Sequence, residues 1–502
     1  MKSQLAWGSG AVVVLFAVLT IGGAGKVAPP ATQPAQVTID LDKSIALELP
    51  AAGADLTPRS FQTKDGRGGW VVRIPGGRPL ATPAYADGML FVGGGYGSHE
   101  FYAFDAATGR KVWEMKTGDD GPTAAVVEDG CVAFNTESCT VIIAEARTGK
   151  LLWQEWLGDP LMSQPAIAKG KLYIAYPGGQ PHGANGPAAQ NGANGAHASA
   201  PGRAPGHRLL CADLKTGRHL WEQDITGDVV SAPVVDANQV FFTCFDGTSF
   251  ALNCADGSIA WQKHNAATSA PLVAGGQVLL TEREQVGKDI HEGLQRLDLK
   301  AGEARDSKLL AAGNAEYLKA GRDGAVALAP TKQASLDSSV GFAAAPQSAG
   351  LSVAASNVNV TTVAGGWAYQ GSRAAFANGR IINAQANRLN CITAGDGQIA
   401  WQAQAVGKGV SDQVQAFSPP AVAGGKLYVC SSRGDLLALG QKDGKPSFLY
   451  STGKPMAFQP ALARGNLYAG TSDGELICLR TGDPTADGWT AWGGNAQHNK
   501  KE

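Results

Sequence analysis

The sequence has little charge and almost no excess of either sign. Only 17% of its 502 residues are Asp, Glu, Lys or Arg, and 42 basic residues stand against 43 acidic ones, giving a formal net charge of −1. Basic nucleic-acid binders carry an excess of Lys and Arg, and acidic tails carry long runs of one sign. Both classes are therefore excluded, and no nucleic-acid partner is expected.

Several motifs that mark enzyme and metal-binding classes are also missing. The sequence has no Walker phosphate loop, no H-E-x-x-H zinc motif and no C-x-x-C-H haem attachment motif. Its eight histidines do not form a ligand set with metal-binding spacing. We therefore assign no catalytic residue and no metal site from the sequence.

A run of uncharged and largely apolar residues stands near the N-terminus, over residues 5–25. A helix of this length could just span the hydrocarbon core of a bilayer, and its most apolar part also suits the core of a signal peptide. Residues 1–26 are therefore predicted to be a signal peptide or a membrane anchor, followed by a linker over residues 27–67. Either alternative places the rest of the chain outside the cytoplasm.

Glycine is abundant, with 66 residues, and part of it belongs to a repeat. A turn signal recurs in a fixed context, as in DAATGRKVW (Asp105–Trp113) and DLKTGRHLW (Asp213–Trp221). Glycine supplies the positive φ of a tight turn, and the aspartate can cap that turn with its side chain. The turn glycine occurs eight times, at Gly109, Gly149, Gly217, Gly257, Gly302, Gly397, Gly444 and Gly482.

A second signal precedes each turn: a proline, a few apolar residues, a glycine and a short β-branched or aromatic run, as in QPAIAKGKLYIAY (Gln164–Tyr176). Each unit of about 40 residues thus holds four short strands, which is the size of a propeller blade. The runs lack the spacing of an amphipathic helix. We predict an all-β fold, an eight-bladed β-propeller of four-stranded antiparallel blades over residues 68–489.

The tryptophan four residues after most of these glycines is large enough to wedge between neighbouring blades. We predict this blade-docking role for Trp70, Trp113, Trp153, Trp221, Trp261 and Trp401. Trp70 has no complete blade before it. Residues 68–74 are therefore expected to join the strands of 458–482 as a fourth strand and close the ring, which removes free sheet edges. Trp489 is the alternative for that position.

Two stretches interrupt the period and are predicted to be insertions. Residues 178–206 are rich in Gly, Ala, Asn and Pro, which predicts a disordered loop. For residues 303–371 we predict a long surface insertion that contains a short helix near residues 316–320.

The eight cysteines include no adjacent pair. Cys211, Cys391 and Cys478 stand where other repeats have Ala and are expected to be small core residues. Cys131 with Cys139, and Cys244 with Cys254, flank predicted hairpins, and they are candidates for two disulfides in an oxidising compartment.

The A-x-D-x-x-T-G-x-x-x-W repeat resembles the pyrroloquinoline-quinone (PQQ) type of β-propeller repeat over residues 68–489. That family contains quinoprotein alcohol dehydrogenases and also non-catalytic propellers, such as the lipoprotein subunit of the outer-membrane β-barrel assembly machinery. The dehydrogenases use a vicinal Cys–Cys disulfide, a bound Ca²⁺ and a catalytic Asp, and this sequence lacks the Cys–Cys pair. We expect no cofactor, with PQQ and Ca²⁺ only under the dehydrogenase alternative.

In propellers, the residues just before the innermost strand of each blade ring the mouth of the central channel. Small hydroxyl and amide side chains gather there in this sequence, and they either bind a polar ligand or peptide or cap strand ends. These candidates are Thr82, Ser163, Gln164, Ser231, Ser269, Ser418 and Gln459. Residues 490–502 are predicted to be a C-terminal tail. The overlapping stretch 487–499 departs from the blade pattern, which indicates a segment that docks on the propeller.

Three functions follow from these observations. The preferred one is a non-catalytic, extracytoplasmic scaffold that binds other envelope proteins or peptides, in envelope or outer-membrane protein assembly. The first alternative is a PQQ-dependent dehydrogenase of alcohols or sugars, and the second is a glycan- or polymer-binding propeller. No cysteine directly follows the N-terminal apolar run, which is a departure from the lipoprotein subunit.

Overall fold

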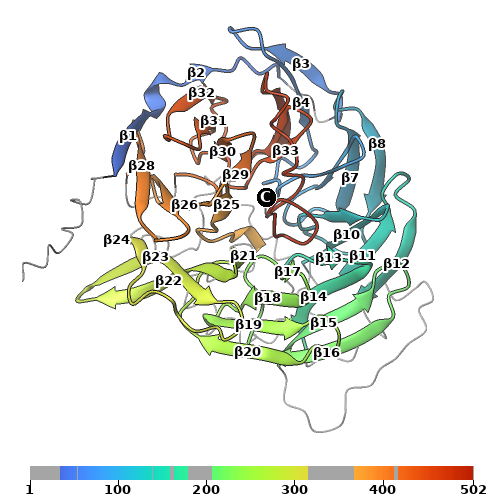
Figure 1. Ribbon diagram of the computed structural model, residues 1–502. Helices are drawn as coiled ribbons and strands as arrows, with labels where there is room; N and C mark the ends of the chain where they lie inside the picture. Colours follow the sequence, from blue (N-terminus) through green and yellow to red (C-terminus); the bar gives the residue numbers. More distant parts are fainter. Residues whose placement is uncertain are drawn as a thin grey trace, which may run out of the picture. The chain divides into compact units, whose positions relative to one another are not determined.

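Eight sheets, each with four antiparallel strands, radiate from a common axis and confirm the predicted eight-bladed propeller (Figure 1). The computed structural model describes residues 34–51, 53, 55–137, 140–158, 163–178, 206–314, 367–411 and 416–500. Residues 1–26, most of the two predicted insertions and the helix expected near 316–320 lie outside these described residues.

In blades one to seven the strands run in chain order from the innermost to the outermost position. Blades one to four consist of β5 (Ala84–Ala86), β6 (Met89–Gly93), β7 (Glu100–Asp105) and β8 (Lys111–Lys116); β9 (Val126–Glu128), β10 (Cys131–Asn135), β11 (Thr140–Glu145) and β12 (Leu151–Trp156); β13 (Ala166–Ala168), β14 (Lys171–Pro177), β15 (His207–Asp213) and β16 (His219–Ile225); and β17 (Val234–Asp236), β18 (Gln239–Thr243), β19 (Thr248–Asn253) and β20 (Ile259–His264). Blades five to seven consist of β21 (Leu272–Ala274), β22 (Gln277–Val286), β23 (Asp289–Asp298) and β24 (Leu310–Asn314); β25 (Ala375–Ala377), β26 (Arg380–Gln385), β27 (Arg388–Thr393) and β28 (Ile399–Val406); and β29 (Ala421–Ala423), β30 (Lys426–Cys430), β31 (Asp435–Gly440) and β32 (Pro446–Ser451).

The eighth blade combines strands from distant parts of the sequence. Its inner strands are β33 (Ala461–Ala463), β34 (Asn466–Gly470) and β35 (Glu475–Arg480), and β4 (Gly68–Arg73) pairs with β35 as the fourth strand. Trp70 lies opposite Cys478 in this pairing. Trp489 instead forms an isolated bridge with Leu462 on the innermost strand. The ring is therefore closed by the strand of Trp70, as expected, and Trp489 takes a different place.

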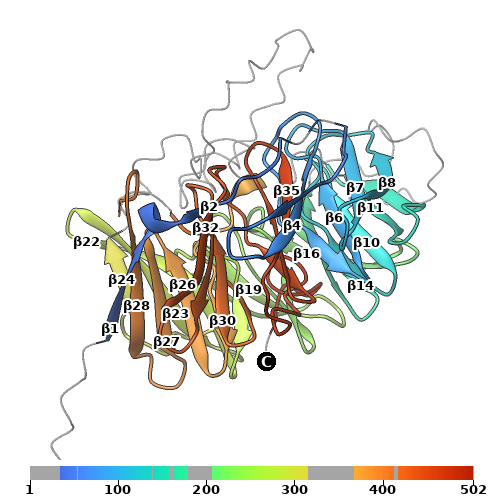
Figure 2. The ribbon, with the colours of Figure 1, turned by 90° about the horizontal axis from the view of Figure 1, so that it is seen from above.

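The expectation of a linker over residues 27–67 is wrong where the structure describes this range. β1 (Ala35–Asp40) pairs in parallel with β28, β2 (Ile45–Ala46) pairs in parallel with β32, and β3 (Arg59–Gln62) pairs antiparallel with β4 (Figure 2). A 3-10 turn, η1 (Leu41–Lys43), follows β1. The repeat pattern could not reveal these strands, because they belong to no blade of their own and add to outer edges that the folded blades supply.

The predicted insertion 303–371 also begins later than expected. β24, at residues 310–314, pairs with β23 as the outer strand of blade five. This blade has no tryptophan after its turn, so its last strand carried no sequence signal.

The repeated turns have the geometry that the sequence indicates. The eight turn glycines have φ values between 66° and 74°, a region that side chains disfavour. The Asp105 carboxylate accepts a hydrogen bond from the backbone N–H of Thr108 at 2.8 Å, and Asp213 accepts one from Thr216 at 2.9 Å. In these two turns glycine and aspartate act for different reasons, one through backbone freedom and the other through capping.

Each blade-docking indole lies across the turn of the next blade. The Nε1–H of Trp113 donates to the carbonyl oxygen of Ala146 at 2.9 Å, and a Cβ added to Gly149 would lie 2.7 Å from the indole ring. The same two contacts recur for Trp70 with Ala106 and Gly109, Trp153 with Leu214 and Gly217, Trp221 with Cys254 and Gly257, Trp261 with Leu299 and Gly302, and Trp401 with Gln441 and Gly444.

The two remaining junctions use arginine in place of an indole. Between blades five and six, Arg296 donates from Nη1 to the carbonyl oxygen of Ala394 at 2.8 Å and is held by Asp306, the residue in the usual tryptophan position. Between blades seven and eight, the guanidinium of Arg67 lies 5.2 Å from the ring centroid of Phe448. All eight junctions therefore carry a flat group against the neighbouring blade.

Replacing Gly149 by alanine tests the contact between indole and glycine. Gly149 and Gly130 both have positive φ, but a Cβ at Gly130 would meet nothing within 4 Å. Gly149→Ala should therefore lower the free energy of unfolding by about 1–3 kcal/mol more than Gly130→Ala, because only the former overpacks the junction. Denaturant unfolding of both variants measures this difference, and equal losses would contradict the docking account.

Candidate functional site at the centre of the ring

The seven residues predicted to ring the channel mouth lie two or three positions before innermost strands. All seven are buried, with at most 4% of their surface exposed. The structure therefore places them at the centre of the ring, but beneath other parts of the chain rather than at an open mouth.

Four of these seven side chains connect loops and strands of the protein itself. Ser231 donates to the carbonyl oxygen of Tyr369, Ser269 and Ser418 accept from the N–H groups of Thr281 and Cys430, and Gln459 donates to the carbonyl oxygen of Pro420 and accepts from the N–H of Gly493. The side chains of Ser231, Ser269, Ser418 and Gln459 are thus used in hydrogen bonds within the protein itself.

The C-terminal residues 489–500, here called the central plug, lie at the centre of the ring (Figure 1). Trp489, Trp492 and His498 are completely buried. The innermost strands of four blades donate backbone hydrogen bonds to carbonyl oxygens of the plug. These bonds run from Leu462 to Trp489, from Tyr85 to Thr490, from Ile167 to Ala496 and from Val235 to Gln497. In a fifth blade, the backbone N–H of Val273 donates to the side-chain oxygen of Asn499. The plug therefore binds five of the eight blades to one another.

His498 contacts two backbone carbonyl oxygens, one in the plug and one in the loop that leads into blade three. Its Nδ1 lies 2.7 Å from the carbonyl oxygen of Trp492, and its Nε2 lies 2.8 Å from that of Pro165. Burial lowers the pKa of His498 to about 4, against the opposing effect of these hydrogen bonds, and the charge of Arg373 adds to the lowering. Burial thus favours the neutral imidazole, which carries a single N–H and donates only one of these two hydrogen bonds.

Residues 367–371, here called the inner strap, contact the loops that lead into innermost strands. Trp367 donates to the carbonyl oxygen of Gly121 at 3.2 Å, and the Tyr369 hydroxyl donates to that of Thr268 at 2.9 Å. Gln370 accepts from the backbone N–H of Gln459 at 3.3 Å. The strap thus links loops of blades that are far apart in the sequence.

A further group of buried polar atoms has no protein partner in the described part of the chain. It comprises Thr82 Oγ1, Ser163 Oγ, Gln164 Oε1, Gln370 Nε2, Arg373 Nε and Nη1, and Trp492 Nε1. Three of the seven sequence candidates, Thr82, Ser163 and Gln164, thus have binding capacity that the protein itself does not use.

The sequence analysis missed Arg373. It stands two residues before β25, the position that Thr82, Gln164 and Gln459 occupy before their own strands. Most blades have a proline directly before the innermost strand, but blade six has Ala374 there. The sequence signal that marks this position was therefore absent.

The predicted disulfide between Cys244 and Cys254 is wrong, since both cysteines are free. Thr243 pairs with Ser249 at one end of the β18–β19 hairpin and Gln239 with Asn253 at the other, so the two thiols lie at opposite ends. A hairpin of this length separates them by roughly 20 Å, beyond the reach of a disulfide.

The other cysteines give no described disulfide. Cys131 is a free buried thiol, and Cys139 lies outside the described residues. Cys211, Cys391 and Cys478 are buried free thiols within strands, and each lies opposite a tryptophan of the neighbouring strand.

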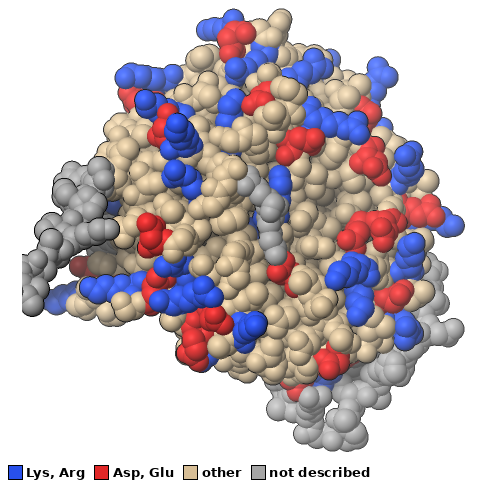
Figure 3. Space-filling model, viewed as in Figure 1, with Lys and Arg blue, Asp and Glu red and all other residues tan. Residues whose placement is uncertain are grey.

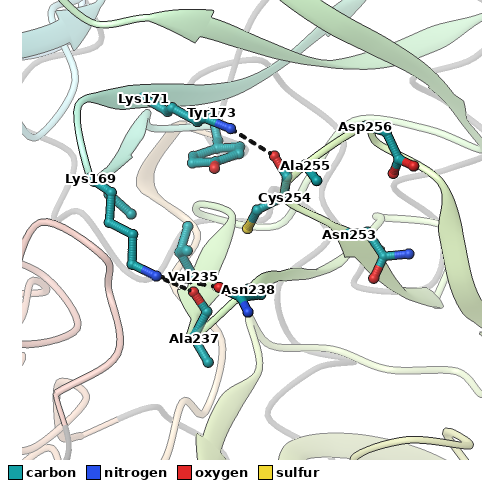
Figure 4. A pocket seen from close by; sticks show the side chains of 11 residues that line it. Lys169, Lys171, Tyr173, Val235, Ala237, Asn238, Asn253, Cys254, Ala255 and Asp256 are labelled. Atoms are coloured by element: carbon teal, nitrogen blue, oxygen red, sulfur yellow. Dashed lines mark hydrogen bonds between the residues drawn. The ribbon is translucent and has the colours of Figure 1, made fainter.

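A pocket of about 480 Å³ lies between blades three and four (Figure 4). Lys169 donates to the carbonyl oxygen of Ala237 at 2.9 Å, and Lys171 donates to that of Cys254 at 3.1 Å. Both ammonium groups are thus engaged by the neighbouring blade, and the pocket wall serves to join the two blades.

The face seen in Figure 3 intersperses basic and acidic side chains among a majority of uncharged ones. Within the ranges that the structure covers, no three His, Cys, Asp or Glu side chains are grouped as metal ligands. Those ranges also contain no helix of the length and hydropathy needed to cross a bilayer.

The family model described as "Outer membrane protein assembly factor BamB" matches residues 56–204, 186–330 and 350–492. The chain belongs to this family. The BamB of Nitrosomonas eutropha is 21% identical over 242 residues, which cover 42% of this chain and 58% of that protein. The match therefore spans little more than half the length of this BamB relative.

Two other similarities concern parts of the chain or its fold. The quinoprotein alcohol dehydrogenase PedH of Pseudomonas putida is 28% identical over 114 residues, 20% of this chain and 19% of that protein. The crystal structure of BamB from Moraxella catarrhalis superposes with a TM-score of 0.51 at 13% identity, covering 84% of this chain and 98% of that one. At this identity the structural likeness shows the fold alone.

The buried state of His498 predicts an acid dependence of stability. A histidine whose pKa is lowered by folding adds stability above its unfolded value of 6.5 and loses that contribution as the pH falls toward 4. Comparing the wild type with His498→Gln by thermal unfolding between pH 7 and pH 4 should show a smaller loss of stability in the variant. Parallel losses in both proteins would contradict a buried neutral imidazole.

Proposed function

We propose that this chain is a non-catalytic, extracytoplasmic scaffold that binds other envelope proteins or peptides during outer-membrane protein assembly. Membership of the BamB family over most of the propeller supports this proposal. The filled centre of the ring also favours it, because the plug and the strap leave the outer surface as the accessible place for partners.

The observation that carries the proposal is the uneven cover of the outer blade edges. β1, β2 and β3 cover blades six, seven and eight, whereas β8, β12, β16, β20 and β24 pair only on their inner side among the described strands. A strand edge presents unpaired N–H and C=O groups that can add another extended chain. The chain's own N-terminal strands use three such edges in this way.

Exposed apolar side chains mark several of the uncovered edges. Val112 on β8, Leu151 and Leu152 on β12, and Ile259 on β20 are between 37% and 49% exposed. All four lie just after the turn glycine of their blade, at the same end of the outer strand. An extended partner segment with apolar residues would pair with the edge and remove these side chains from water.

A charge-introducing variant of β12 tests the edge as a binding surface. Leu151→Lys combined with Leu152→Lys should reduce photo-crosslinking of envelope proteins to a probe in β12, and reduce outer-membrane protein levels when the variant replaces the wild type in a deletion strain. Because both side chains are already exposed, stability should change by only about 0.5 kcal/mol per site.

Val406→Lys supplies the matched control. Val406 is 38% exposed but lies on β28, whose edge is covered by β1. This variant should keep wild-type crosslinking and outer-membrane protein levels. Unchanged crosslinking in the β12 variant, or equal losses in both variants, would contradict the proposal.

The partial similarity to PedH makes a PQQ-dependent dehydrogenase the second candidate. Incubation with PQQ and Ca²⁺ followed by gel filtration should leave no quinone absorbance on the protein, and no dye reduction with alcohols or sugars. A known quinoprotein dehydrogenase treated in parallel serves as the positive control. Retained quinone with substrate-dependent dye reduction would favour the enzyme over the scaffold.

A further inference from the structure

Arg373 is a buried guanidinium at the centre of the ring, with 1% of its surface exposed. Its Nη2 donates to the carbonyl oxygens of Pro271 and His498, and its guanidinium carbon lies 4.7 Å from the ring centroid of Trp492. Its Nε and Nη1 have no protein partner. The side chain is therefore fixed by blade five and the plug while its Nε and Nη1 donors remain unused.

No described carboxylate neutralises this cation. The adjacent Ser372 donates to Glu292 at 2.6 Å, but Glu292 is paired with Arg283 at 3.3 Å. Burial lowers the pKa of Arg373 to about 9, so the guanidinium is still charged at neutral pH. A buried charge without a counter-charge is strongly unfavourable.

Two further unpartnered donors belong to the segments next to Arg373. The Gln370 amide nitrogen lies in the strap, just before Arg373 in the chain, and the Trp492 indole nitrogen belongs to the plug residue whose ring packs against the guanidinium. Buried water could satisfy the neutral groups but would not neutralise the guanidinium. A donor-rich group with one buried cation suits an oxyanion.

We propose that a small oxyanion binds to Arg373 through one of its two unpartnered donors, Nε or Nη1, at the centre of the ring between the inner strap and the central plug. Phosphate, sulfate and small carboxylates share the required chemistry, because each presents a negatively charged oxygen that accepts a charge-assisted hydrogen bond from a guanidinium N–H. The bound anion neutralises Arg373 and links two segments that lie more than a hundred residues apart in the sequence.

Ion chromatography on the full chain tests the proposal directly. The protein is desalted extensively into sodium chloride buffer and then denatured. The wild type should release about one equivalent of phosphate, sulfate or a carboxylate, and Arg373→Met should release none. The identity of the released ion distinguishes the three sources. Release of no oxyanion, or of chloride alone, would overturn the proposal.

Thermal unfolding provides the second measurement, and it needs no variant to fold. After overnight equilibration at constant ionic strength, at least one of phosphate, sulfate and acetate should raise the unfolding midpoint of the wild type by about 2–5 °C relative to chloride. Arg373→Met should lose this shift. Arg433→Met, which removes an outer-surface arginine paired with Asp42, should retain it. Identical midpoints of the wild type in all four salts would contradict an oxyanion site.

Discussion

The contact between an indole and the turn glycine of the next blade is the interaction on which the whole ring depends. An indole buries roughly 200 Å², so each of the six junctions with an indole gains several kcal/mol of hydrophobic stabilisation before conformational entropy is subtracted. The close approach requires the missing Cβ of glycine, and the indole N–H satisfies a carbonyl oxygen at the edge of the neighbouring sheet. The turn glycine and the tryptophan together therefore supply the turn, the packing between blades and a hydrogen bond. This explains why the repeat is so regular.

Closure of the ring determines what remains available for function. Pairing of β4 with β35 leaves no gap between the first and last blades, and the central plug joins the innermost strands. The N-terminal strands cover the outer edges of blades six to eight, and no other described strand covers the outer edges of the remaining five. The centre of the ring is thus held by the chain itself, and the rim is the surface that the proposed scaffold role uses. This division of roles is consistent with a scaffold of the BamB family.

Local repetition made the fold predictable from the sequence. Eight turn glycines and six tryptophans at one spacing indicate both the number of blades and the docking side chains, because each blade repeats the same physical solution. Trp70 was recognisable as the closing strand, since it carries the same signal without a blade before it. The features that were missed depend on long-range contacts. β1 and β2 pair with edges formed more than 350 residues later, and Cys244 and Cys254 are close in sequence but lie at opposite ends of one hairpin.

The candidate site shows the same limit. The position of Thr82, Ser163 and Gln164 before innermost strands could be predicted from the proline signal, but their nearly complete burial could not. Arg373 occupies an equivalent position without the proline, so only the structure identifies it. Residue-resolved hydrogen–deuterium exchange of the free chain tests the closed and filled ring most directly. The amides of Tyr85, Ile167, Val235 and Leu462, which donate to plug carbonyl oxygens, should exchange as slowly as the amides inside the blades. Rapid exchange of these four amides, with the blade interiors still protected, would show that the plug does not occupy the centre and would contradict this account.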